Sequence, residues 1–189
     1  MEFVDKKNIF FIPGWMHSCK YYGMNNGVDI WKDNFFLNEK VNSQFVAGHS
    51  LGANYCLYLY KKGFDFEKII LVNPVFSTRN FFSLALRWIL HAIFEKTNSD
   101  KISVFRAKHF LLSLPKIFKI LSINYDKIIE TIPKDKIIVI RGKEDRFLCG
   151  KRTVDLLERN GIQLFNIKNA NHNWCPEFKN KIFEICNKN

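Results

Sequence analysis

Five short apolar runs constrain the fold of this chain more than any other feature. They are rich in β-branched and aromatic residues and lack the alternation of a half-exposed sheet, so they predict buried parallel strands. Between most of them lie stretches with helical spacing, at Leu51 to Lys62, Lys151 to Asn160 and Glu177 to Asn187. Strands alternating with helices indicate a parallel sheet covered by helices. The predicted strands are 8–13, 44–47, 68–73, 136–141 and 163–167.

The interval from Phe76 to Pro133 breaks this alternation. It contains many apolar residues and no convincing strand, and its patterns fit helices around 80–95, 102–113 and 116–130. We therefore expect one domain over residues 1–189, with 76–133 inserted between two strands as a helical segment.

Composition restricts the classes of function. Hydrophobic residues make up 47% of the chain and charged residues 25%, a balance that supports a buried core and excludes a disordered tail. The five cysteines form no zinc-binding or C-x-x-C spacing, which is typical of reduced thiols in a cytoplasmic protein. The longest apolar stretch, Phe81 to Phe94, includes Arg87 and His91 and is too short to span a bilayer.

The formal net charge of +11 favours acidic partners. The basic residues are dispersed, without the arginine clusters or aromatic-basic interleaving of a nucleic-acid groove. We therefore predict no nucleic-acid partner, although charge alone leaves a binder of nucleic acid or membrane surfaces as an alternative.

The motif Gly48-His-Ser-Leu-Gly52 carries the first chemical signal. It follows a predicted strand and opens a predicted helix, as the sharp turn of a nucleophile elbow requires. The two glycines leave room for this turn, and Ser50 would stand at a helix N-terminus, where developing negative charge is favoured. The alternative interpretation is a tight turn with an N-capping serine.

A nucleophilic serine needs a base, and His172 is the best of the five histidines. It lies in the loop after the last predicted strand, at the same carboxyl edge of the sheet as Ser50. His49 adjoins the serine with its side chain expected to point elsewhere, and His91 and His109 lie in predicted helices, where a surface or packing role is usual.

Asp145 is the predicted carboxylate that orients His172. It follows the strand 136–141 at that carboxyl edge, whereas Asp135 precedes the strand and lies at the opposite end; Glu144 is a fallback. For the oxyanion we expect two backbone N–H groups, those of Leu51 and Trp15.

These motifs resemble those of the α/β-hydrolase superfamily, over nearly the whole chain. Ile12-Pro-Gly-Trp15 stands where the family carries its oxyanion motif, and the elbow, Gly142-Lys-Glu-Asp145 and Asn171-His172 follow in the family's order. The resemblance implies a reduced, mostly parallel five- to six-stranded α/β-hydrolase sheet with flanking helices and 76–133 as the lid. The chain departs from the family between residues 14 and 43, where only Asp29 to Leu37 is helix-like and one crossover fits. With strands in simple order, the connecting helices would lie on one face, and the C-terminal helix and the segment near 20–37 would cover the other.

The resemblance implies a serine carboxylesterase that needs no metal or cofactor. Gly14-Trp15 is similar to the esterases that cleave pimeloyl-[acyl-carrier-protein] methyl ester in biotin synthesis, and Gly48 to Ala53 is similar to acyl-carrier-protein thioesterases. A non-catalytic binding protein on the same scaffold is the third hypothesis.

The insertion suggests how a substrate would be bound. Residues 79–131 contain nine basic and four acidic residues, which would suit an acidic acyl carrier protein above an apolar slot. Alternatively, its aromatic residues pack the insertion on the domain while its lysines stay solvated. The predicted substrate-binding residues are Trp15, Arg87, Trp88, Arg106 and Phe110, and the predicted basic rim comprises Arg87, Arg106, Lys108, Lys116 and Lys119.

Overall fold

The fold is that of a computed structural model, which describes residues 9–31, 43–76, 80–95 and 107–188, with only the backbone of 107–109. Its centre is a five-stranded sheet in which every pairing is parallel and the strands follow the simple order β1-β2-β3-β4-β5. The predicted strands and the parallel sheet are thus confirmed. The strands are β1 (Ile9–Ile12), β2 (Phe45–His49), β3 (Lys68–Val72), β4 (Ile137–Gly142) and β5 (Gln163–Ile167).

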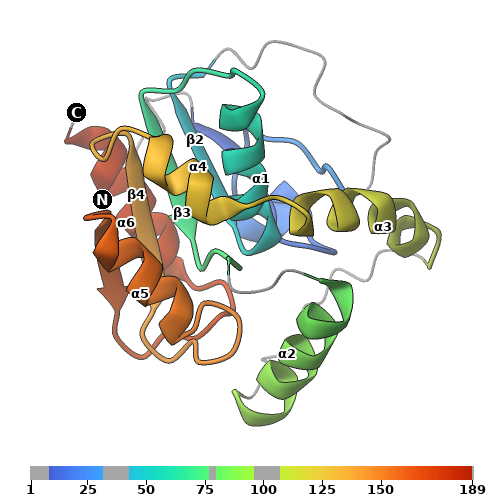
Figure 1. The fold of residues 1–189 in the computed structure, drawn as a ribbon. Coiled ribbons are helices and arrows are strands. Elements are labelled where there is room, and N and C mark those ends of the chain that lie inside the picture. Colours follow the sequence, from blue (N-terminus) through green and yellow to red (C-terminus); the bar gives the residue numbers. More distant parts are fainter. Residues whose placement is uncertain (1–8, 32–42, 77–79, 96–106, 189) are drawn as a thin grey trace.

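The two faces of the sheet bury different sets of side chains. Because successive strand residues point to opposite faces, Val46 and Val139 belong to one core cluster, whereas Ala47 and Ile140 belong to the other. The first cluster lies under four helices, namely α1 (Leu51–Lys61), α3 (Ala107–Leu121), α4 (Tyr125–Thr131) and α5 (Lys151–Arg159) (Figure 1).

The second face is covered as the simple strand order predicts. The helix α6 (Pro176–Asn187) buries Phe178 and Ile182 there, and the short 3-10 helix η1 (Cys19–Tyr22) adds Tyr22. Trp31, by contrast, packs in the cluster on the α1 side. The helix-like piece Asp29 to Leu37 lies mostly outside the described residues, and its described part, 29–31, contains a turn.

The insertion consists of α2 (Phe81–Phe94), α3 and α4 in its described part. Figure 1 shows α2 standing out from the sheet and its covering helices. Asn80 caps α2 by accepting a hydrogen bond from the Ser83 N–H at 2.8 Å. The predicted helix boundary before residue 116 is wrong, because α3 continues through Pro115 and places Ile117 in the core.

The helix α2 exposes most of its large apolar side chains, and α3 exposes three among its described side chains. Among the described residues, the large hydrophobics that remain exposed all lie on these helices. They are Phe82, Leu86, Trp88, Ile89, Ile93, Phe94, Leu111, Leu112 and Phe118. The alternative that the aromatic residues pack the insertion on the domain therefore fails for Phe82 and Trp88, whereas Phe94 still contacts Phe147.

The predicted basic rim is corrected by the structure at one position, Lys116. Lys116 is buried, and its ammonium group donates a hydrogen bond to the Ile30 carbonyl. Lys119 lies over the ring of Tyr58, on the α1 side. The charge pattern could not reveal this, because a lysine stem readily packs on apolar surface. Lys108 and Arg106 fall outside the described side chains.

None of the described helices is long and apolar enough to cross a bilayer.

Candidate active site

Ser50 occupies the turn between β2 and α1, and its backbone is strained. Its φ of 54° and ψ of −125° fall outside the regions that non-glycine residues favour. The flanking glycines make this turn possible because their neighbours leave no room for a side chain. A Cβ at Gly48 would lie 2.5 Å from the Gly52 carbonyl oxygen, and one at Gly52 would lie 2.3 Å from that of Ile12. Strain of this kind is typical of functional sites.

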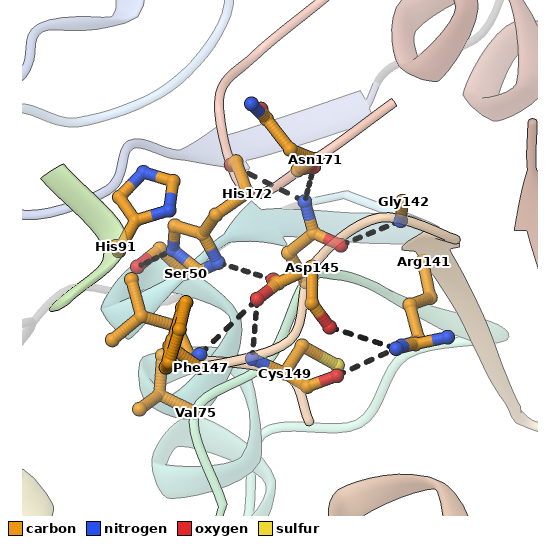
Figure 2. A network of polar contacts seen from close by, with 12 residues as sticks. Ser50, Val75, His91, Arg141, Gly142, Asp145, Phe147, Cys149, Asn171 and His172 are labelled. Carbon is orange, nitrogen blue, oxygen red and sulfur yellow. Dashed lines mark hydrogen bonds and ion pairs between the residues drawn. The ribbon is translucent and has the colours of Figure 1, made fainter. Parts of the chain in front are cut away.

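Ser50, His172 and Asp145 form one chain of hydrogen bonds (Figure 2). The Ser50 hydroxyl donates to His172 Nε2 at 2.8 Å, and His172 Nδ1–H donates to Asp145 Oδ2 at 2.5 Å. The carboxylate partner fixes the proton on Nδ1 and leaves Nε2 free to accept a proton from serine. The structure therefore brings together the three residues that were predicted as nucleophile, base and acid.

Asp145 is fully buried, and its carboxylate accepts several hydrogen bonds. Its Oδ1 accepts hydrogen bonds from the N–H groups of Leu148 and Cys149, at 3.1 and 3.0 Å. Burial alone would raise the pKa of the Asp145 carboxyl, but His172 and these N–H groups outweigh it and hold the pKa below its usual range. Asp145 is thus an anion that can stabilise a positive charge on His172.

The loop that carries Asp145 is held by Arg141 at the end of β4. Its guanidinium donates to the carbonyls of Asp145 and Cys149, at 2.7 and 2.8 Å (Figure 2). The fallback residue Glu144 does not contact His172. Its side chain is half exposed and pairs with Arg146 at 3.7 Å.

His49 supports the site in a way that the sequence did not reveal. It is buried, accepts a hydrogen bond from the Tyr22 hydroxyl at 2.9 Å, and donates from Nε2 to the His172 carbonyl at 2.8 Å. Burial, and then the neighbouring His172 ring, lower the pKa of His49 well below its usual value, so His49 is neutral. The Tyr22 hydroxyl in turn accepts from the Gly14 N–H at 3.0 Å, which links the loop after β1 to the loop of His172.

Asn73, at the end of β3, is a second supporting residue outside the sequence prediction. Its amide donates to the Asn171 and His172 carbonyls at 2.9 and 3.2 Å, and its oxygen accepts from the Gly142 N–H at 2.8 Å. It thereby joins the loops that carry the base and the acid. The only sequence signal was an asparagine directly after a strand, at the carboxyl edge of the sheet.

The two backbone N–H groups that were predicted to bind an oxyanion, those of Trp15 and Leu51, have no partner within the described part of the protein. The carbonyl of Trp15 accepts a hydrogen bond from His17 Nδ1–H at 2.8 Å, and its indole donates to Ser113 at 3.0 Å. These contacts fix the loop after β1 beside the elbow.

The other predicted substrate-binding residues have different surroundings. Phe110 packs against Trp15, with ring centroids 5.4 Å apart. Arg87 donates to the Phe147 carbonyl at 2.8 Å, so it ties α2 to the loop of Asp145. Trp88 is half exposed on α2, and Arg106 lies outside the described residues.

His91 lies closer to the site than the sequence suggested. It is buried, and its ring centroid is 5.4 Å from that of His172 (Figure 2). Of the surface and packing roles expected for His91, its burial agrees with packing. Among the described side chains, no group of three or more His, Cys, Asp or Glu residues is arranged to hold a metal ion.

Comparisons with known proteins show which solved structures share this fold. No protein-family model matches the chain, and no curated protein matches its sequence. Solved structures do match. They include the putative non-heme bromoperoxidase BpoC from Mycobacterium tuberculosis H37Rv, at 10% identity and a TM-score of 0.56, covering 95% of this chain and 90% of that one.

Two further structures agree. The α/β hydrolase MGS-MChE2, from the metagenome of sediments of the Mar Chica lagoon in Morocco, is 13% identical with a TM-score of 0.56, covering 95% and 88% of the two chains. TT1662 from Thermus thermophilus is 11% identical with a TM-score of 0.55, covering 95% and 87%. The parallel sheet, the strained serine turn and these likenesses together identify the α/β-hydrolase fold in this chain.

Proposed function

We propose that this protein is a serine hydrolase that cleaves carboxylic esters through an acyl-enzyme. The observation that carries the proposal is the hydrogen-bonded chain Ser50–His172–Asp145, with Ser50 on a strained turn at a helix N-terminus. This arrangement supplies a nucleophile, a base and an orienting anion at contact distance.

The reaction would proceed in two halves. Ser50 Oγ attacks the ester carbonyl carbon while His172 Nε2 takes the serine proton, and the N–H groups of Leu51 and Trp15 bind the resulting oxyanion. His172 then gives that proton to the leaving alkoxide, which departs as an alcohol. In the second half, His172 deprotonates a water that attacks the acyl-serine, and the acid is released as Ser50 regains its proton.

The specific substrate we propose is an acyl ester delivered on an acyl carrier protein, with pimeloyl-[acyl-carrier-protein] methyl ester as the leading candidate. The Gly14-Trp15 pattern and the apolar pair Trp15 and Phe110 beside the elbow support it. The burial of Lys116 removes one charge from the basic rim that would attract the carrier, whereas Lys119 stays exposed.

A substrate panel tests the proposal. Purified protein should hydrolyse short p-nitrophenyl esters, and the Ser50→Ala variant should not. Methyl esters and thioesters of the same acyl groups, free and carrier-bound, separate an esterase from a thioesterase. A folded wild-type protein without turnover on the entire panel would favour a non-catalytic binding protein on this scaffold.

A further inference from the structure

Both neighbours of His172 in the sequence are tied to the inserted helix α2. The Asn171 side chain donates to the Glu95 carbonyl at 2.9 Å, directly after the last residue of α2. The Asn173 side-chain oxygen lies 3.3 Å from His91 Nε2, and the Asn173 N–H donates to the Asn171 side-chain oxygen at 2.8 Å. His172 is thus bracketed by two contacts with one helix.

A buried ion pair completes these contacts into a closed ring. His91 Nδ1–H donates to Glu95 Oε2 at 2.9 Å, and both side chains are almost fully buried, at 2% and 5% exposure. In this ring, His91 contacts Asn173, Asn173 contacts Asn171, and Asn171 contacts the Glu95 carbonyl. The Glu95 carboxylate then closes the ring at His91. We call these four residues the α2 clamp.

The α2 clamp also reaches the loop of Asp145. The second oxygen of the Glu95 carboxylate accepts a hydrogen bond from the Arg146 N–H at 2.8 Å. Glu95 consequently touches the residue directly after Asp145 while its helix holds the residues on either side of His172. One turn of α2 connects the two loops whose spacing sets the Asp145–His172 hydrogen bond.

We propose that His91 and Glu95 are positioning residues, which hold the loops of Asp145 and His172 at the separation that the reaction requires. This inference rests on the proposed hydrolase function and assigns to the insertion a part in assembling the triad. Misplacement of reacting groups by about 1 Å can cost on the order of 10²-fold in rate, so such a clamp has a kinetic effect.

Both contacts of His91 are hydrogen bonds when the ring carries a proton on each nitrogen. Nδ1–H faces a carboxylate, and Nε2 faces an oxygen of Asn173, so both nitrogens donate only in the imidazolium form. The groups that face His91 are Glu95 from its own helix, His172 from the loop after β5, Asp145 from the loop after β4, and His49 from β2.

The charge balance supports this form. Burial acts to lower the pKa of His91, but Glu95, Asn173 and Asp145 together raise it above its usual value. Because the folded state favours the proton, the α2 clamp is complete at low pH and weakens as pH rises through the raised pKa. The wild-type rate should then fall on the alkaline side of its pH profile.

Kinetics across pH test the proposal with four proteins. His91→Gln should lower kcat by about 10-fold, with KM changed less than about twofold, and should abolish the alkaline fall. Glu95→Gln keeps an acceptor for the Arg146 N–H but loses the charge, so it should move the alkaline fall to lower pH. Ile93→Gln, an exposed position of the same helix, should match the wild type. Wild-type kcat and an unchanged profile in His91→Gln would overturn the proposal.

Amide hydrogen exchange separates this inference from the proposed function because it needs no turnover. In His91→Gln, exchange of residues 143–149 and 169–174 should accelerate by about 10-fold or more, and in Ile93→Gln it should not. If the wild-type protein hydrolyses no ester but exchange is still faster in His91→Gln, the hydrolase function is refuted and the α2 clamp is supported. Unchanged exchange would refute the clamp, whatever the activity.

Discussion

At the scale of single residues, the site depends on two protonation states that burial and neighbours impose. Asp145 stays ionised because His172 and two N–H groups outweigh the cost of its burial. His49 stays neutral because burial disfavours its charged form, and it therefore donates to the His172 carbonyl while it accepts from Tyr22. Asp145 thus holds the ring of His172, and His49 holds its backbone carbonyl.

Substitutions in the triad should separate the roles of its members. His172→Ala should lower kcat on a p-nitrophenyl ester by on the order of 10⁴–10⁶-fold, since triad members act as a unit. Asp145→Asn should cost somewhat less. Glu144→Gln is the matched control, one residue away and half exposed, and should keep wild-type kcat. A loss in Glu144→Gln comparable to that in Asp145→Asn would show that the acid has been assigned wrongly.

The buried neutral His49 predicts how stability depends on pH. Its lowered pKa means that the unfolded chain takes up a proton below about pH 6.5 where the folded chain does not, so unfolding becomes easier as pH falls. The free energy of unfolding from urea titrations should drop between pH 7.5 and 5. The drop should be smaller in His49→Gln, and an equal drop in both proteins would contradict the neutral assignment.

At the scale of elements, the turn at Ser50 and the helix α2 illustrate opposite kinds of packing. The turn leaves no spare volume, because carbonyl oxygens occupy the space beside Gly48 and Gly52. The helix α2 buries few side chains, chiefly Leu84 and His91, and leaves a broad apolar surface exposed. Its position therefore depends on a small number of contacts at one side.

The tight turn predicts a large effect of one methyl group. Gly52→Ala should lower the free energy of unfolding by about 3 kcal/mol, because its Cβ would lie 2.3 Å from the Ile12 carbonyl oxygen. Gly63→Ala is the control, since nothing lies within 4 Å of a Cβ there. It should cost about 1 kcal/mol, from its positive φ alone. Similar losses in both variants would argue against the close approach of β1 and α1.

Two leucines on α2 provide a matched pair for the helix. Leu84 is 3% exposed and Leu86 is 58% exposed, on one helix and two positions apart. Leu84→Ala should cost about 2–3 kcal/mol of unfolding free energy, and Leu86→Ala should stay within about 0.5 kcal/mol. Equal effects in chemical denaturation would show that α2 presents a different face to the domain.

At the scale of the whole molecule, the sheet and the triad were predictable from the sequence for one physical reason. Buried parallel strands need continuous apolar runs, and the residues that follow them gather at one edge of the sheet. Together with the motif Gly48-His-Ser-Leu-Gly52, that rule indicates Ser50, Asp145 and His172. It also explains why α6 and η1 cover the second face once the strands run in simple order.

The supporting residues could not be found in the same way. His91, Asn73 and His49 act through contacts with a loop roughly 80 to 120 residues away, and no local pattern encodes such contacts. Lys116 shows the same limit. A lysine in a basic segment is expected at the surface, and only the folded structure shows that it bonds the buried Ile30 carbonyl. The helix α3 continues through Pro115 because Ile117 and Ile120 pack in the core, which outweighs the local helix-breaking tendency.

Covalent labelling of the serine tests the central claim most directly. A fluorophosphonate reacts rapidly with a serine that a neighbouring base activates, and mass spectrometry of the digested protein locates the adduct. We predict one adduct, on the peptide containing Ser50, which disappears in Ser50→Ala and forms far more slowly in His172→Ala. A folded wild-type protein that gains no adduct at Ser50, or that labels as fast without His172, would contradict the account.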